Sequence, residues 1–249
     1  MAAQGVGERT AALSGSPADG DRAMPASGEL RRERRIAAAG PPAQRMPQGV
    51  RQTFEREQTL AEGSQGEKRL YAVRQGILVS SLSLNGEDAL VSALHFPGDL
   101  VPVAWSASER PVTLKAVTDA EVEVFAEDAL RRFFQQDAEG GFLFFERICD
   151  LLVSQRETNC ILRRLSVEGR LASFLLTLGG HLGVREGRRF RIALPMRRCE
   201  IANYLGLRSE TLSRVFARWR AGGLIEPGEL RQITFPDIGR LEAASRDET

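Results

Sequence analysis

The most informative stretch of this chain is CEIANYLGLRSETLSRVFARWR, residues 199–220. Gly206 divides the stretch, and glycine adopts the backbone conformations that a tight turn between two helices requires. Six apolar residues flank this turn at spacings that let them face inward together: Ile201, Leu205, Leu207, Leu212, Val215 and Phe216. The stretch therefore predicts two short helices packed against each other, a helix-turn-helix.

The second predicted helix exposes a polar face that suits the edges of DNA bases. Glu210 and Arg214 lie four residues apart and so share this face. An arginine can donate two hydrogen bonds to guanine, and a glutamate can accept one from the cytosine amino group. The alternative is an ordinary surface ion pair, worth only ~0.3–0.5 kcal/mol. We favour base recognition, because the pair lies at the start of the second helix, where base edges come within reach.

Charge is distributed unevenly along the chain, although its net charge is only +1. Residues 51–162 carry 11 Lys and Arg against 18 Asp and Glu, a balance of −7. Residues 163–220 carry 13 Arg against four Glu, a balance of +9. Because the basic segment suits a polyanion, the pattern predicts a sensor or scaffold domain joined to a nucleic-acid-binding module.

The region before the helix-turn-helix divides into three parts. Residues 1–50 are rich in Ala, Gly, Pro, Ser and Arg and predict a disordered arm. The basic run within this arm, residues 31–35, is either a solvated charge run or a phosphate-seeking segment. Residues 51–127 contain short β-type runs separated by turn signals, which predict an antiparallel β-roll or jelly roll. Residues 128–165 predict one long helix.

This long helix carries a stripe with alternating steps of three and four residues, which is typical of a helix pair. The stripe comprises Phe145, Ile148, Leu152, Gln155, Asn159 and Leu162. We predict that it forms the seam of a homodimer and that its two polar residues set the register. The alternative is that the stripe packs on the β-roll of its own chain.

Residues 166–238 predict a winged helix-turn-helix domain, followed by a tail over residues 239–249. A helix that ends at Gly179-Gly180 and a strand are expected before the quoted stretch. Two short strands around Pro227-Gly228 are expected after it. The whole chain is thus expected to be an α+β protein with a β-roll, a dimerisation helix and a winged helix-turn-helix.

Enzymes, metalloproteins and membrane proteins fit the sequence less well. The three cysteines, Cys149, Cys160 and Cys199, lack CxxC spacing, which argues against disulfides and a zinc site. The histidines, His95 and His181, fall in different predicted domains, so neither a β-roll metalloenzyme nor another enzyme is expected. No export signal or apolar run of roughly 18 residues is present, so a cytoplasmic location is expected. A β-roll interaction protein without DNA binding stays open.

Three segments resemble the CRP/FNR family of bacterial transcription regulators, in its FNR/FixK-like branch. EIANYLGLRSETLSR (200–214) resembles the recognition motif, LYAVRQGILVSSLSLNGEDALVSALHFPGDLV (70–101) the cyclic-nucleotide-binding-like β-roll, and SVEGRLASFLLTL (166–178) the helix after the dimerisation helix. The resemblance spans about residues 52–238. It implies a homodimeric activator that works with RNA polymerase in oxygen-, nitrogen-oxide- or redox-linked metabolism.

The resemblance also implies a DNA site. By position, Glu210, Ser213 and Arg214 match the branch's base-contacting residues, which implies an inverted repeat of TTGA half-sites in double-stranded DNA. Ser209 stands where the cAMP-receptor branch has an arginine, which also points to the TTGA class. Auxiliary contacts, mainly to phosphate, are expected from Arg197, Arg198, Arg208, Ser209, Thr211 and Arg218.

The signals known in this family match the sequence poorly, so no cofactor is expected. The family's cyclic-nucleotide pocket uses a Gly-Glu-Leu turn and an Arg-Ser pair, whereas this chain has Gly98-Asp99-Leu100 and Arg110-Pro111. A proline offers neither a hydroxyl nor a backbone N–H to a phosphate.

Iron–sulfur sensing is excluded by the sequence, whereas haem, cyclic-nucleotide and cysteine redox sensing stay open. No cysteine precedes Cys149, so the four thiolates of an iron–sulfur cluster are missing. A regulator that depends on haem, with His95 as the ligand, or on a cyclic nucleotide stays an alternative. Cys199 is a hypothetical redox site, because it lies next to Arg197 and Arg198 and its oxidation would place negative charge near phosphate.

Overall fold

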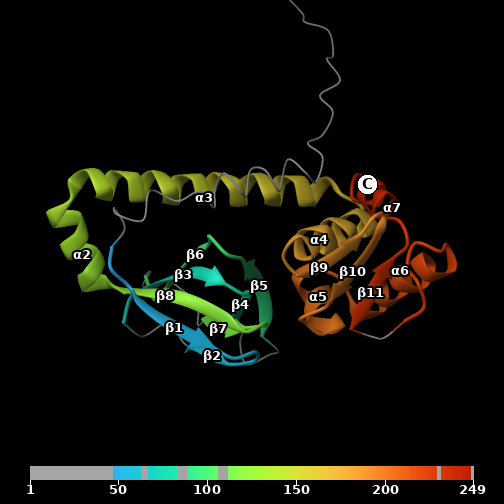
Figure 1. The fold of residues 1–249 in the computed structure, drawn as a ribbon, viewed down its shortest axis with the longest axis horizontal. Helices are drawn as coiled ribbons and strands as arrows, with labels where there is room; N and C mark the ends of the chain where they lie inside the picture. Colours follow the sequence, from blue (N-terminus) through green and yellow to red (C-terminus); the bar gives the residue numbers. More distant parts are fainter. Residues whose placement is uncertain (1–46, 63–66, 84–88, 106–111, 229–230, 248–249) are drawn as a thin grey trace, which may run out of the picture.

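The computed structural model describes residues 47–62, 67–83, 89–105, 112–228 and 231–247. The arm predicted over residues 1–50 lies outside the described residues, except for its last four. A β-domain, a long helix beside it and a C-terminal domain follow one another along the chain (Figure 1). The α+β class predicted from the sequence is confirmed. Within the described residues, no helix combines the length and apolarity needed to cross a bilayer.

The β-domain consists of two antiparallel sheets of four strands each. The first contains, in order, β1 (Val50–Phe54), β8 (Ala120–Ala126), β3 (Arg69–Gln75) and β6 (Leu100–Val103). The second contains β2 (Thr59–Glu62), β7 (Val112–Ala116), β4 (Leu78–Leu82) and β5 (Leu90–His95). Buried and half-buried residues alternate along β8, where Val122 is fully buried between its glutamate neighbours. The alternation folds these strands around one core, as the β-roll prediction expects.

The predicted single helix over residues 128–165 is two helices, α2 (Glu127–Gln136) and α3 (Ala138–Arg164). Asp137 separates them, because its backbone leaves the helical region and its carboxylate accepts a hydrogen bond from the Gly140 N–H at 2.8 Å. Phe144 of α3 and Leu130 of α2 pack with Phe125 of β8 in one cluster. The long helix α3 thus lies fixed against the β-domain.

The C-terminal domain contains α4 (Val167–Leu182), β9 (Gly183–Glu186), β10 (Arg189–Ala193), α5 (Arg198–Tyr204), α6 (Ser209–Ala221), β11 (Gln232–Phe235) and α7 (Ile238–Ala244). Its sheet is antiparallel in the order β11-β10-β9. The helix α7 falls within the predicted tail, yet its Leu241 is fully buried in the domain core.

Two details of the C-terminal domain differ from the prediction. Helix α4 does not end at Gly179-Gly180 but continues to Leu182. A Cβ at Gly179 would lie 2.1 Å from the Phe190 ring, so this glycine permits close packing on β10 and does not stop the helix. Of the two strands expected around Pro227-Gly228, the described residues contain only β11, and the neighbouring strands β9 and β10 form a hairpin.

Candidate DNA interface

The turn between α5 and α6 has the geometry that the quoted stretch predicts. Gly206 has a φ of +66°, a conformation that favours glycine. The N–H of Leu207 donates to the Ala202 carbonyl at 2.8 Å and closes the turn. Five of the six predicted apolar residues are buried and the sixth, Leu207, packs partly buried against the same core. The helix-turn-helix prediction is therefore confirmed.

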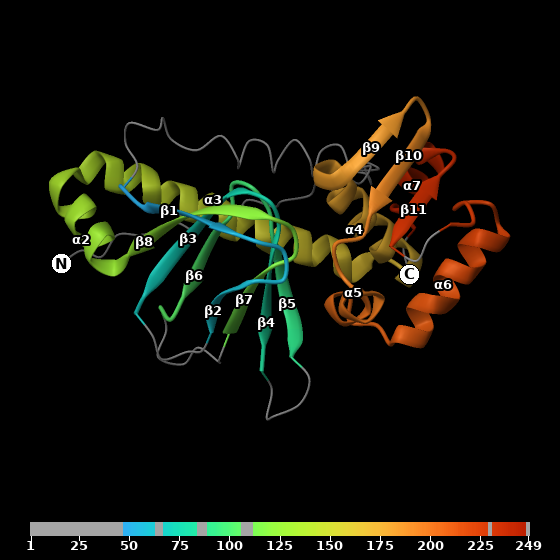
Figure 2. The same cartoon turned by 60° about the horizontal axis from the view of Figure 1, so that its bottom comes forward.

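The C-terminal half of α6 is held by neighbouring helices. Arg240 of α7 donates hydrogen bonds to the Gly222 and Gly223 carbonyls, both at 2.9 Å, which satisfies carbonyls at the end of α6. Glu168 of α4 accepts a hydrogen bond from the Trp219 indole at 2.9 Å. These contacts fix the direction of α6, which lies on the side of the molecule away from the β-domain (Figure 2).

The N-terminal half of α6 presents the predicted base-contacting residues to solvent. Glu210, Ser213 and Arg214 are all exposed, and their i, i+3 and i+4 spacing brings them together on one helix face. No ion pair joins Glu210 to Arg214 in the part of the chain that the structure describes. Both side chains are exposed to solvent.

The expected phosphate contacts fall into two groups. Arg208 and Ser209 are exposed at the N-terminus of α6, and Thr211 is half-buried beside them. Arg197 is exposed at the N-terminus of α5, where its hydrogen bond and ion pair with Glu200, at 3.1 Å, raise its pKa.

Arg198 and Arg218, which are also expected to contact DNA, make contacts within the domain. The half-buried Arg198 guanidinium stacks 4.8 Å from the Phe216 ring centre, and burial, helped by the charge of Arg220, lowers its pKa. Arg218 turns back to α4 and binds Glu168 through two hydrogen bonds of 2.6 and 2.9 Å. Both arginines therefore stabilise the fold of the domain in the absence of DNA, and their role as phosphate contacts stays a prediction.

The salt dependence of DNA binding is expected to distinguish Arg208, which is exposed, from Arg218, which is paired with Glu168. Arg208→Ala is expected to reduce the slope of log affinity against log salt by about two, roughly one for each protomer of a dimer. Arg218→Ala is expected to leave this slope unchanged and to lower the free energy of unfolding by roughly 1 kcal/mol, because Glu168 loses one of its two partners and keeps only the Trp219 indole. DNA titrations between about 50 and 200 mM salt, together with urea unfolding, measure both effects. Equal slopes for the two variants would contradict the assignment of Arg208 as a phosphate contact.

The residues considered for signal binding occupy local structural roles. The Asp99 carboxylate accepts a hydrogen bond from the Phe96 N–H at 2.8 Å and closes its own turn. Arg147 of α3 is buried and donates to the Gly98 carbonyl at 3.0 Å. His95 is buried and its Nε2 lies 2.6 Å from the Ser80 hydroxyl. Arg110 and Pro111 lie outside the described residues, and Cys199 is exposed.

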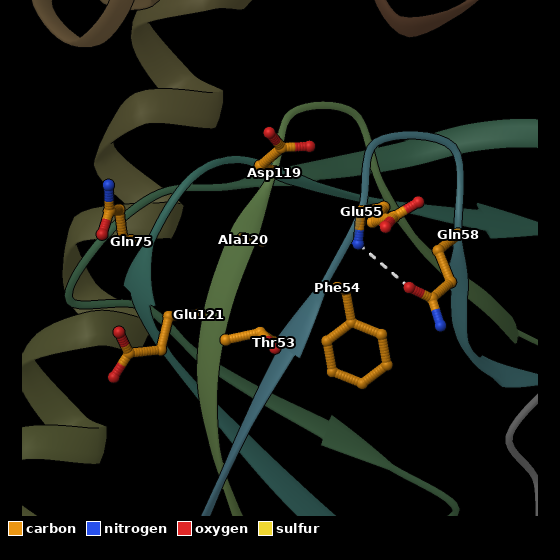
Figure 3. Close-up of a pocket in the computed structure, with 8 residues that line it drawn as sticks. All are labelled: Thr53, Phe54, Glu55, Gln58, Gln75, Asp119, Ala120 and Glu121. Atoms are coloured by element: carbon orange, nitrogen blue, oxygen red, sulfur yellow. Dashed lines mark hydrogen bonds between the residues drawn. The ribbon is translucent and has the colours of Figure 1, made fainter.

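An open groove of about 660 Å³ on the β-domain differs in character from the α6 surface (Figure 3). It is lined by Thr53, Phe54, Glu55, Gln58, Gln75, Asp119, Ala120 and Glu121. Its three carboxylates make it unsuited to a phosphate backbone. Among the described residues, no three His, Cys, Asp or Glu side chains gather as a metal site would require.

Sequence reasoning missed the residues that orient α6. Glu168 and Arg240 lie outside the quoted stretch and act through contacts that span 51 and 17–18 residues. Asn203 lies inside the stretch but was not singled out; its amide oxygen accepts a hydrogen bond from the β-domain at 2.8 Å. The sequence offers one hint of these contacts: Glu168 is one of only four glutamates in the basic segment 163–220 and therefore invites a search for a basic partner.

Comparisons with known proteins point to one class. The family model of a Crp-like helix-turn-helix domain matches residues 169–244. The transcriptional regulatory protein btr of Bordetella pertussis is 30% identical over 190 residues, 75% of this chain and 78% of that protein. The anaerobic regulatory protein of Haemophilus influenzae is 29% identical over 201 residues, 79% of this chain and 77% of that protein. The structure of FixK2 from Bradyrhizobium japonicum matches 81% of this chain and 98% of that one, at 24% identity and a TM-score of 0.62.

Proposed function

The chain belongs to the CRP/FNR family of DNA-binding transcription regulators, and we propose that it acts as a homodimer on an inverted repeat of TTGA half-sites. Glu210, Ser213 and Arg214 are proposed to contact the bases, with Arg214 bound to the guanine and Glu210 to the cytosine amino group. Arg197, Arg208, Ser209 and Thr211 are proposed to contact the backbone. The family is one of regulators and not of enzymes.

One observation carries the proposal. The side chains of Glu210 and Arg214 share one exposed face at the start of α6 and do not neutralise each other. An unpaired carboxylate on a DNA-facing helix repels phosphate, so its presence is favourable only if it accepts a hydrogen bond from a base. The single G·C pair of a TTGA half-site offers the acceptors and the donor that these two side chains need.

The proposed dimer uses the exposed side of α3. Phe142, Phe145, Leu152 and Val153 are large apolar residues of this helix with 45–61% exposure. Ile148, by contrast, is partly buried and packs towards the β-domain, so this member of the stripe follows the alternative in which the helix covers its own chain. Gln155 is exposed, and the side chains of Asn159 and Leu162 lie outside the described residues. Apolar exposure of this kind supports a helix-to-helix interface with a second copy.

A two-fold axis along paired α3 helices suits a palindromic site. The two α6 helices would enter successive major grooves about 34 Å apart. Contact with RNA polymerase, activation, and a role in oxygen-, nitrogen-oxide- or redox-linked metabolism are part of the proposal; the anaerobic relative supports the last of these. The local roles of Asp99 and His95 support a regulator that binds DNA without an added effector.

Fluorescence anisotropy of the purified chain tests the proposal directly. We expect tight binding, in air and without ligand, to a TTGAT-N4-ATCAA duplex, and at least about 10³-fold weaker binding to a duplex with both G·C pairs exchanged. Repeating the titration with cAMP, with haem and with reductant is expected to change neither affinity. Equal affinity for the two duplexes under every condition would remove the TTGA assignment, whereas discrimination only with an added effector would establish the effector-dependent alternative.

A further inference from the structure

The C-terminal domain is not joined to the β-domain through α3 alone. Residues of the second sheet, among them Val91, Leu94 and Phe96, belong to the same apolar cluster as the core of the C-terminal domain. The Phe96 ring also stacks on His181 of α4, with 4.4 Å between ring centres and 18° between planes. The sheet and the helix-turn-helix therefore share one core, and their relative orientation is defined by packing.

A hydrogen bond connects this sheet to the helix-turn-helix. The Asn203 amide oxygen of α5 accepts a hydrogen bond from the Val91 N–H at 2.8 Å. Val91 lies on β5, the last strand of its sheet, beside an irregularity in the β4–β5 register. An N–H on the outer side of an edge strand has no strand to pair with. Asn203 supplies the partner for this N–H, since Val91 itself is buried.

Asn203 also closes the turn that leads into the recognition helix. Its backbone carbonyl accepts hydrogen bonds from the N–H groups of Leu205 and Gly206 at the end of α5. The same residue therefore contacts the β-domain with its side chain and shapes the α5–α6 turn with its backbone. At the other end of α5, Arg56 from the β1–β2 turn donates to the Pro195 carbonyl at 3.0 Å, just before that helix begins. Both ends of α5 are thus tied to the β-domain.

We propose that Asn203 is a positioning residue, which couples the β-domain to the recognition helix α6 by holding the α5–α6 turn against the edge of β5. The β-domain then acts as a fixed platform that sets the direction of α6 before DNA is bound. A dimer must place two such helices in register with two half-sites, so a loosened turn weakens specific binding more than non-specific binding. This inference rests on the proposed function, because it assumes that α6 recognises a half-site.

Two variants at one position distinguish positioning from general stability. Asn203→Ala removes the acceptor for the Val91 N–H, whereas Asn203→Asp keeps an acceptor oxygen at the same place. We expect Asn203→Ala to bind the TTGA duplex about fivefold to twentyfold more weakly, with unchanged affinity for the G·C-exchanged duplex and an unchanged salt slope. Asn203→Asp is expected to restore the ratio of the two affinities. Ser92→Ala is the matched control, because the Ser92 hydroxyl donates to the Ser80 carbonyl within the sheet and, among the described residues, makes no hydrogen bond to the helix-turn-helix.

Amide hydrogen exchange of the full chain gives a second measurement that does not depend on DNA. The Val91 N–H is expected to exchange faster in Asn203→Ala than in the wild type and in Asn203→Asp. Arg56→Ala changes an exposed residue at the same contact between the β-domain and the C-terminal domain. Like Asn203→Ala, it is expected to weaken specific binding. Wild-type discrimination with an unchanged ratio in Asn203→Ala, or equal losses in the Ala and Asp variants, would overturn the inference. A wild type that does not discriminate removes the proposed function instead, and the exchange measurement then still tests the coupling.

Discussion

An Arg214→Ala variant is expected to lose most of its preference for the TTGA duplex over the G·C-exchanged duplex. Arg214 is exposed on the face of α6 that carries Glu210 and forms no ion pair with it. Its guanidinium is therefore available to O6 and N7 of guanine. A lost base contact costs ~1–3 kcal/mol, and a homodimer loses two, so affinity for the TTGA duplex should fall by about 30-fold or more. Anisotropy titrations on both duplexes measure the ratio.

Arg220→Ala is the matched control for this experiment. Arg220 is an exposed arginine of the same helix, six residues further along, and so lies beyond the proposed base contacts. Its removal deletes the same charge without deleting a base contact, so both duplexes should lose affinity equally. If Arg214→Ala and Arg220→Ala weaken the two duplexes to the same extent, Arg214 acts through its charge alone and the base assignment is incorrect.

For a Glu210→Ala variant, the same titrations are expected to show a change of opposite sign in the affinity for the exchanged duplex. Glu210→Ala removes the proposed acceptor for the cytosine amino group, so discrimination should fall. It also removes a negative charge that faces phosphate, so affinity for the exchanged duplex should rise. Loss of preference together with a gain in affinity for the exchanged duplex is what a base-contacting carboxylate requires, whereas a glutamate that acts through its charge alone gives the gain without the loss of preference.

The parts of the structure that follow local patterns were predictable from the sequence. Alternating apolar residues such as Val122 and Val124 fix which side of β8 faces the core, and Gly206 marks a turn that needs a positive φ. The face proposed to contact bases also follows from helical spacing alone, since Glu210, Ser213 and Arg214 lie within two turns. Local periodicity therefore determined the strands, the helix-turn-helix and the exposed face of α6.

The roles of individual arginines were not predictable, because they depend on partners far away in the sequence. Arg218 looks like another basic residue of α6 until folding brings Glu168 of α4 to it. Arg198 likewise depends on the position of the Phe216 ring. A charged residue on a helix can turn to DNA or back to the domain, and only the three-dimensional arrangement distinguishes the two.

The break between α2 and α3 and the orientation of α3 show the same limit. The step pattern of the predicted stripe placed Ile148 beside Phe145 and Leu152, but the helix turns Ile148 partly into the β-domain. A helix that must cover a sheet and also face a second copy has two apolar sides, and periodicity alone does not assign them. Phe142 and Val153, outside the predicted stripe, are exposed and widen the free side.

A Leu152→Glu substitution on the exposed side of α3 is expected to abolish the proposed homodimer. Leu152 is 60% exposed in the single chain and belongs to the apolar side of α3 that also contains Phe142, Phe145 and Val153. In the proposed homodimer it becomes buried against its counterpart, so the substitution would place two like charges in an apolar seam. The burial of two leucines, worth roughly 1.5–3 kcal/mol each, is lost as well. We expect a folded monomer at micromolar concentration.

Loss of the dimer removes the simultaneous occupation of two half-sites. A linked pair of modules gains roughly 10²–10⁴ in affinity over one module, so Leu152→Glu should weaken binding to the palindrome by that factor while a single half-site duplex is bound as before. Sedimentation velocity and anisotropy measure the two effects. Val50→Glu is the control, because Val50 is 64% exposed but lies on β1. A Leu152→Glu protein that stays dimeric, while the control behaves as the wild type, would place the interface elsewhere on the chain.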